Sequence, residues 1–82
     1  PARPAAMRNL LCTGALTAAA RGRGAGREVD GEVATYWYGK APSRAMRKLG
    51  HITATGDDVA GARERAAAAY RRLLGDPSGA AA

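Results

Sequence analysis

Two short runs of strand-forming residues, separated by a compact segment rich in turn residues, constrain this chain more than any other feature of its sequence. Gly39 and Pro42 interrupt the chain after the first run, and Gly50 opens the second. Runs of aromatic and β-branched residues divided in this way are typical of a β-hairpin. The sequence therefore predicts that Tyr36–Tyr38 pairs in antiparallel fashion with His51–Thr53.

The segment between the two runs is strongly basic. It holds four of the thirteen lysines and arginines within nine positions: Lys40, Arg44, Arg47 and Lys48. A short hairpin loop cannot spread four cations far apart, so they predict a local positive pocket. Arginine offers a planar fork of donors and lysine a point charge, and together they suit a small dianion such as a phosphate monoester.

This segment resembles the C-terminal signature of 5-(carboxyamino)imidazole ribonucleotide synthase, the ATP-grasp ligase that is the ATPase subunit of phosphoribosylaminoimidazole carboxylase. The matching residues are Tyr38-Gly39-Lys40, Arg44 and Arg47-Lys48-Leu49-Gly50-His51. Where the family pattern has Pro-Gly in the loop, this chain has Ala45-Met46, which removes a preset turn.

The resemblance extends on both sides of the loop and covers roughly residues 6 to 74, without residues 13 to 32. Upstream, Met7-x-Asn9-Leu10-Leu11 is similar to a strand of the family. Downstream, Ile52-Thr53 and Asp57-Asp58 fit its closing strand and the start of its last helix.

The resemblance implies a domain that closes the substrate side of an enzyme acting on 5-aminoimidazole ribonucleotide, bicarbonate and ATP. In such enzymes ATP activates bicarbonate as carboxyphosphate, and the substrate amine captures the carboxyl group. ATP and Mg²⁺ are expected on the ATP-grasp lobes of the parent enzyme, outside this segment, and the parent enzyme is expected to be a cytoplasmic homodimer. Carried over by position, Lys40 and Arg47 are the leading ligands of the ribose 5-phosphate, with Arg44 and Lys48 secondary. His51 is expected to give structural support.

The rest of the chain predicts an α+β fold, in which a small antiparallel sheet of two to four short strands packs against one C-terminal helix. Strands are expected at Met7–Cys12, Val33–Tyr38 and Gly50–Thr55. Residues 15–20 predict a helical turn, residues 21–28 a flexible loop and residues 29–32 a turn.

The C-terminal helix is expected from about Asp58 to Leu74. Asp57 or Asp58 caps its first turn, and Gly75 followed by Pro77 ends it. Charged residues lie on its outer side: Arg63, Glu64, Arg71 and Arg72. Its apolar face is expected to pack on the hairpin through Val59, Ala62, Ala66, Ala69, Tyr70 and Leu73.

Eighty-two residues suffice for one small domain, which we place at residues 6–75, after a linker at 1–5 and before a disordered tail at 76–82. A chain this short buries only about 60% of its unfolded surface, so its core is expected to be marginal and to pack against a neighbour. The chain begins with Pro1, and we interpret it as a segment of a longer protein. No apolar run of about 18 residues predicts a membrane span. The lone Cys12 is expected in the core, and no metal-ligand set accompanies His51.

A small RNA- or DNA-binding module is the alternative function. The net charge of +6, the Arg-Gly alternation at residues 21–27 and the aromatic strand favour it. The arginines are scattered rather than arranged in a stripe, however, and the order of the motifs favours the ligase domain, so nucleic acid is not the expected partner. The chain contains no catalytic dyad, acidic metal pair or nucleotide-binding loop, so the isolated segment is expected to be inactive as an enzyme.

Overall fold

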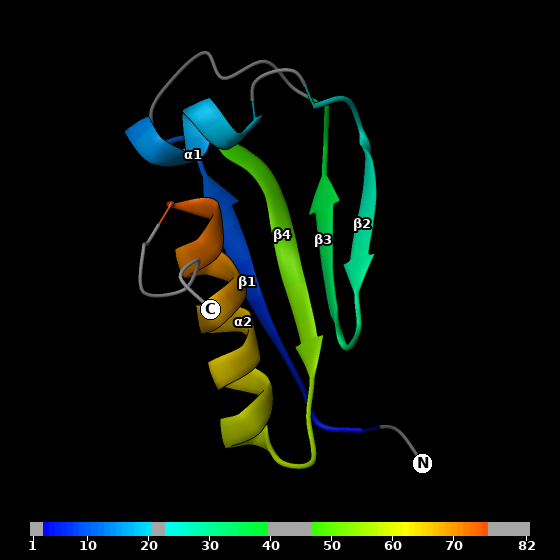
Figure 1. The fold of residues 1–82 in the computed structure, drawn as a ribbon. Coiled ribbons are helices and arrows are strands. Elements are labelled where there is room, and N and C mark those ends of the chain that lie inside the picture. The colour runs from blue at the N-terminus through cyan, green and yellow to red at the C-terminus, as the bar shows by residue number, and fades with distance from the viewer. Residues whose placement is uncertain (1–2, 21–22, 40–46, 76–82) are drawn as a thin grey trace.

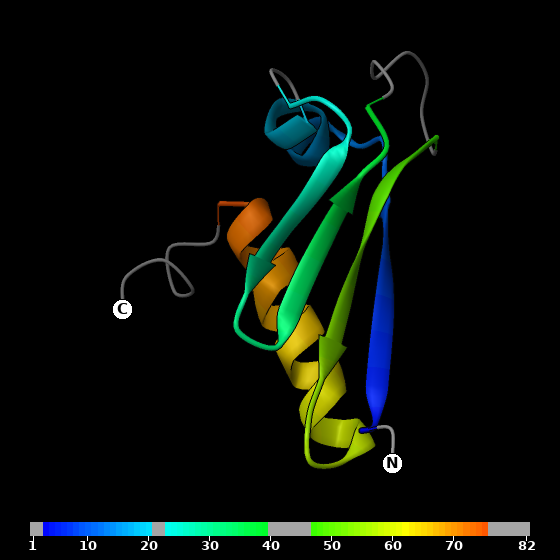
Figure 2. The same ribbon diagram turned by 90° about the vertical axis from the view of Figure 1, so that its right-hand side faces the viewer.

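The computed structural model describes residues 3–20, 23–39 and 47–75 of the 82-residue chain. These residues form a four-stranded antiparallel sheet with helices on one face (Figures 1 and 2). The α+β prediction is confirmed. The strands are β1 (Ala5–Leu11), β2 (Gly26–Asp30), β3 (Val33–Trp37) and β4 (Lys48–Thr55), and the helices are α1 (Gly14–Ala20) and α2 (Val59–Leu73).

The order of the strands, β1-β4-β3-β2, places β4 in the centre of the sheet. On one side His51 of β4 pairs with Tyr36 of β3, and on the other it pairs with Asn9 of β1. The predicted antiparallel hairpin is therefore confirmed, but its register differs: His51–Thr53 lie opposite Ala34–Tyr36, and Trp37 and Tyr38 lie opposite Gly50 and Leu49. The strands before and after the basic segment, β3 and β4, are thus the two that have neighbours on both edges.

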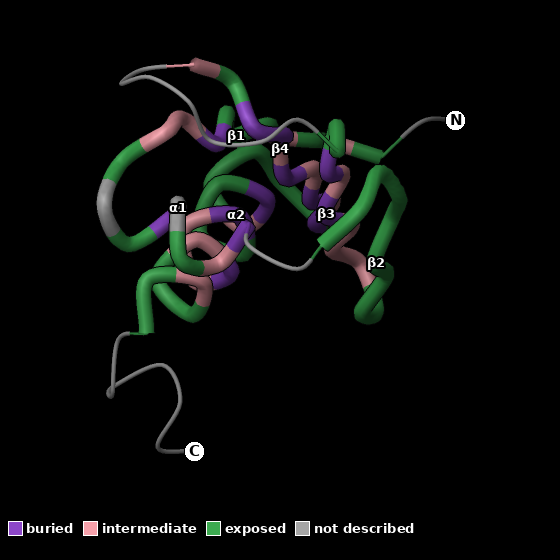
Figure 3. The backbone as a smooth tube through the Cα atoms, turned by 90° about the horizontal axis from the view of Figure 1, so that it is seen from above, coloured by how far each residue is buried: buried purple, intermediate pink, exposed green. Residues whose placement is uncertain are grey.

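The core lies between the sheet and the two helices, as the burial colours of Figure 3 show. Strand alternation sends Thr35 and Trp37 of β3 to this side, together with Ile52 and Ala54 of β4. The fully buried large side chains are Leu10, Leu16, Leu49 and Ile52. Cys12 is half-buried, packs against this core and forms no disulfide. The other face of the sheet carries no helix, and we call it the open face.

Helix α2 has the caps that its sequence predicts. The Asp58 carboxylate accepts a hydrogen bond from the Gly61 N–H at 2.7 Å, and Gly75 follows the helix with a φ of 77°. The buried stripe of α2 consists only of alanines, Ala62, Ala66 and Ala69. Small side chains of this kind let the helix lie close to the sheet.

We expect Asp58→Ala to destabilise the domain by about 1 kcal/mol, because the amide of Gly61 then loses its acceptor. For a domain of this size that loss lowers Tm by roughly 4–8 °C in a thermal melt. Asp58→Asn is the matched control, since asparagine is an equally good N-cap and should keep nearly all of the stability. Equal losses for both variants would contradict the capping role.

Two details of the predicted helix packing are wrong. Val59 is not on the buried face: it lies at the margin of the alanine stripe in the first turn, and half of its side chain is exposed. The helix also packs chiefly on β1 and β4, with only a marginal contact to β3. The reason is topological, because β4 lies beside β1 and the helix centres on that pair.

The flexible loop predicted for residues 21–28 is also wrong in part, since Gly26–Asp30 form the edge strand β2. Every residue of β2 is exposed, so its sequence carries no burial pattern. Pairing with β3 holds it in place, from Gly26↔Trp37 to Asp30↔Val33. The predicted turn between them is confirmed, and Gly31 there has a φ of 60°.

An ionic cluster ties the chain together at the end of the sheet that contains this turn. Glu32 accepts from both Arg3 and Arg65, and Arg3 also contacts Asp57 at 3.0 Å. Arg65 donates to the Thr55 carbonyl at 2.6 Å. The cluster joins the N-terminal segment, the β2–β3 turn and both ends of the β4–α2 connection.

The first strand begins inside the segment that we predict to be a linker. Ala5 is the first residue of β1, and the Pro4 carbonyl accepts from the Gly56 N–H at 3.1 Å. The predicted tail at residues 76–82 lies outside the described residues, and the division of the chain stays a prediction. Within the part that the structure describes, neither helix is long and apolar enough to cross a membrane.

Candidate phosphate-binding site

The two ends of the basic segment are fixed side by side by strand pairing. Trp37, the last residue of β3, lies opposite Gly50 of β4. One residue further, the Tyr38 N–H donates to the Leu49 carbonyl at 3.0 Å. The chain therefore leaves β3 and enters β4 at neighbouring points, so the two ends of the basic segment lie side by side.

The structure describes two of the four predicted phosphate ligands. Arg47, half-buried, directly precedes β4, and Lys48 is its exposed first residue. Lys40 and Arg44 lie outside the described residues, as do Pro42 and Ala45-Met46 of the expected turn. The assignment of these four side chains to one anion stays a prediction.

The backbone that carries Arg47 and Lys48 is held by β1 and by the segment that follows it. The Arg47 carbonyl accepts from the Cys12 N–H at 2.7 Å, and Lys48 pairs with Leu11. The register between β1 and β4 shifts at this point, between Leu10 and Leu11. Both cations are thus attached to a backbone that is bonded to the chain at the end of β1, and the next residue, Leu49, is bonded to Tyr38 at the other end of the loop.

The charge distribution along the chain favours an anion at this end of the sheet. Residues 33–56 contain all four loop cations and no aspartate or glutamate. The carboxylates of the described residues lie on β2, around the β2–β3 turn and at the start and middle of α2: Glu28, Asp30, Glu32, Asp57, Asp58 and Glu64. A stretch of sequence that is rich in cations and has no acidic residue of its own attracts small anions.

A cluster of rings lies on the open face beside the loop. The rings of Tyr36 and His51 stack with centroids 4.6 Å apart and planes 19° apart. The hydroxyl of Tyr38 is 2.8 Å from Nδ1 of His51. Neither tyrosine belongs to the core, since Tyr38 is 39% exposed and Tyr36 is half-buried. Of the aromatic run, only Trp37 is buried in the core.

The missed signal was the hairpin register. Alternation places Tyr36 and Tyr38 on one face of β3 and places His51 on one face of β4. Once His51 pairs with Tyr36, all three must share a face. Strand alternation combined with the register of the hairpin therefore predicts the cluster.

Several arginines outside the loop are engaged within the fold. Arg23 pairs with Glu28 at 2.6 Å and lies 4.9 Å from the centroid of the Trp37 ring. Arg8 lies 4.1 Å from the centroid of the Tyr70 ring. Together with the contacts of Arg3 and Arg65 to Glu32, these interactions use the scattered positive charge for structure. They weaken the case for a continuous nucleic-acid surface.

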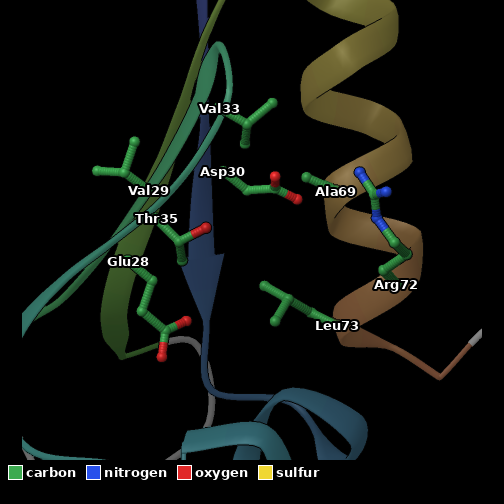
Figure 4. Close-up of a pocket in the computed structure, with 8 residues that line it drawn as sticks. All are labelled: Glu28, Val29, Asp30, Val33, Thr35, Ala69, Arg72 and Leu73. Carbon is green, nitrogen blue, oxygen red and sulfur yellow. The ribbon is translucent and has the colours of Figure 1, made fainter.

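A groove of about 170 Å³ lies between α2 and the β2–β3 hairpin (Figure 4). Glu28 and Asp30 line one wall, and Arg72 lies across from them on α2. None of the predicted phosphate ligands lines this groove. Two carboxylates make its strand wall unfavourable for a phosphate, so the groove does not replace the loop as the candidate site.

Comparison with known protein families identifies the kind of domain that this fold and loop belong to. Residues 5–65 match the family described as the phosphoribosylaminoimidazole carboxylase C-terminal domain. The chain belongs to this family, as a C-terminal domain of the carboxylase ATPase subunit, and the resemblance of the loop motif is confirmed. The match includes residues 13–32, for which the motif gave no counterpart. Neither a curated protein nor a solved structure matches the chain.

Proposed function

We propose that this domain forms the substrate side of an ATP-dependent ligase that carboxylates 5-aminoimidazole ribonucleotide, and that its basic loop binds the ribose 5-phosphate. Membership of the carboxylase family supports a role in purine biosynthesis. The single observation that supports the phosphate site most is the Tyr38–Leu49 backbone bond, which brings the two ends of the loop together. Lys40 and Arg47 begin and nearly end that loop, so their side chains can converge on one anion.

The four cations are proposed to differ in role. Arg47 would give the phosphate a forked contact and Lys40 a point charge. Arg44 and Lys48 would add to the field, and one of them would pair with a carboxylate elsewhere in the parent enzyme. His51 stacks on Tyr36 and forms a hydrogen bond with Tyr38. It would support the loop without contacting substrate.

ATP and Mg²⁺ are proposed to bind to the ATP-grasp lobes of the parent enzyme, which we propose is a homodimer. Among the described residues, no group of three or more histidines, cysteines or carboxylates is placed to hold a metal ion. We propose that the chain alone does not hydrolyse ATP or carboxylate the substrate, which a measurement of ADP release would test.

We expect ribose 5-phosphate to bind to the chain at the ends of the basic loop. In an NMR titration at physiological salt, the amide signals of residues 38–40 and 47–48 should shift with ribose 5-phosphate and stay in place with ribose. The reason is that only the phosphate offers charge to the loop cations. Equal shifts with ribose, or shifts confined to β2 and α2, would contradict the proposal.

The same NMR titration, carried out with an oligonucleotide, distinguishes the nucleic-acid alternative from the ligase proposal. Exposed Tyr38 and Arg27 lie on the open face, and stacking of bases on such a face is the feature that would favour it. A single-stranded oligonucleotide should then bind more tightly than ribose 5-phosphate at physiological salt and shift the amides of Arg27 and Tyr36. The ligase proposal predicts only weak binding that added salt abolishes.

A further inference from the structure

His51 joins two adjacent strands at the point where the basic loop begins. Its ring stacks on Tyr36, the residue paired with it across the sheet, and its Nδ1 atom forms the 2.8 Å hydrogen bond with the Tyr38 hydroxyl. Tyr38 lies one residue beyond β3 and two residues before Lys40. The imidazole thus contacts the last side chain before Lys40, the predicted phosphate ligand, since Gly39 has none.

The backbone at this point is confined from the other side as well. Gly39 has a φ of 77°, and a Cβ built on it would lie 2.8 Å from the backbone nitrogen of Ala25. A side chain at position 39 would therefore be strained and would collide with the chain entering β2. The Tyr38–His51 bond on one side and Ala25 on the other therefore restrict the backbone at Tyr38 and Gly39.

The Tyr38–His51 bond contributes little to the core. Tyr38 is exposed, His51 is half-buried, and both lie on the face of the sheet opposite the helices. A neutral hydrogen bond at such a position adds little net stability, since water replaces it in the unfolded chain. Either tautomer of the His51 ring can form it, because Nδ1 can accept from the hydroxyl or donate to it. These properties suit a contact that orients a segment.

We propose that Tyr38 and His51 are positioning residues for the phosphate loop. Their hydrogen bond fixes the point at which the chain leaves β3, two residues before Lys40 in the sequence, and preorganisation of this kind lowers the cost of binding the anion. This inference rests on the proposed function, since it assumes that Lys40 and Arg47 bind the substrate phosphate. Neither residue is assigned a contact with substrate or with the reacting atoms.

The test uses Tyr38→Phe in the carboxylase that carries this domain, with Tyr36→Phe as the matched control. Tyr38→Phe removes only the hydroxyl that contacts His51, whereas Tyr36→Phe keeps the ring that stacks on it. We expect KM for 5-aminoimidazole ribonucleotide to rise about three- to tenfold in Tyr38→Phe, the effect of one neutral hydrogen bond. KM for ATP, kcat and Tm should stay at the values of the control.

A second pair of variants distinguishes positioning from general support. His51→Asn keeps a polar atom close to the place of Nδ1 and should restore much of the affinity that His51→Ala loses. In the Lys40→Ala background, Tyr38→Phe should have no further effect, because the residue it acts through is gone. Additive losses, or equal effects of Tyr38→Phe and Tyr36→Phe, would overturn the positioning role.

The two proposals fail in different ways. If Lys40→Ala and Arg47→Ala leave KM for 5-aminoimidazole ribonucleotide unchanged, the phosphate site itself is wrong, and the positioning role falls with it. If those variants raise KM while Tyr38→Phe matches its control, the phosphate site stands and only the role of Tyr38 and His51 is refuted.

Discussion

Gly50→Ala should unfold this domain or leave it barely stable, although it adds a single methyl group. A Cβ built at position 50 would collide with the Tyr36 carbonyl oxygen and lie 3.2 Å from Cα of Trp37. Both are backbone atoms of the strand that pairs with β4, so neither can move without opening the hairpin. Overpacking against a backbone that cannot give way costs about 3 kcal/mol or more. A small domain has only about 5–15 kcal/mol in total, so urea unfolding should show a large loss.

Gly26→Ala is the matched control for this substitution. Gly26 also lies in a strand, but a Cβ there has nothing within 4 Å and its φ is not positive. Its replacement should be neutral or stabilise the domain by about 0.4–1 kcal/mol through the unfolded chain. If Gly50→Ala were as stable as Gly26→Ala, the close approach of β3 and β4 would be wrong, and with it the closed base of the phosphate loop.

Lys40→Ala and Arg47→Ala should each raise KM for 5-aminoimidazole ribonucleotide by about ten- to a hundredfold in the carboxylase that carries this domain. A charge-assisted hydrogen bond contributes roughly 1.5–3 kcal/mol, which corresponds to that loss of affinity. Arg47→Lys should also weaken binding, because a forked contact becomes a point contact. KM for ATP should stay nearly level, since ATP is proposed to bind outside this domain.

Arg63→Ala is the control for the loss of a positive charge, because Arg63 is exposed on α2 and lies away from the loop in the sequence and in the fold. Equal damage from Arg63→Ala, or an effect on ATP instead of the nucleotide, would contradict the pocket. If Arg44→Ala were damaging and Arg47→Ala were not, the ligand would be Arg44. The replacement of Pro-Gly by Ala45-Met46 in the loop is the sequence feature that would explain such an exchange.

The hairpin and the last helix could be predicted because their sequences carry strong local signals. The aromatic run before Gly39 and the apolar alternation after Gly50 predict two strands that only a tight connection can join. Asp58 is the N-cap of α2, and Gly75 follows its last turn with a positive φ, as the sequence predicts. In each case, the physical cause of the element lies within a few residues of it.

The edge strand β2 and the position of Val59 could not be predicted in this way. β2 is exposed along its whole length and exists because β3 offers it hydrogen bonds, so its own residues need not alternate. Val59 has the spacing of a buried residue but lies at the margin of the stripe, where the helix begins. Both depend on how elements distant in sequence are arranged, which a local pattern does not contain.

The candidate site, too, could be predicted only in part from the sequence. Its cations could be identified from the sequence, because four of them lie together and match a family motif. The Tyr36–His51–Tyr38 cluster required the register between β3 and β4, and the function of Gly50 required the distance between those strands. Side chains that act through a contact between two strands can be identified only when the register of those strands is known.

The central claim is that Arg47 binds the phosphate of the substrate, and its most direct test compares two substrates that differ only in that group. The measurement is kcat/KM of wild-type and Arg47→Ala carboxylase for 5-aminoimidazole ribonucleotide and for the corresponding riboside, which has no phosphate. The account predicts that Arg47→Ala lowers kcat/KM for the nucleotide about ten- to a hundredfold and leaves the value for the riboside within about twofold. A loss of the same size for both substrates would contradict it, because Arg47 would then act on something other than the phosphate.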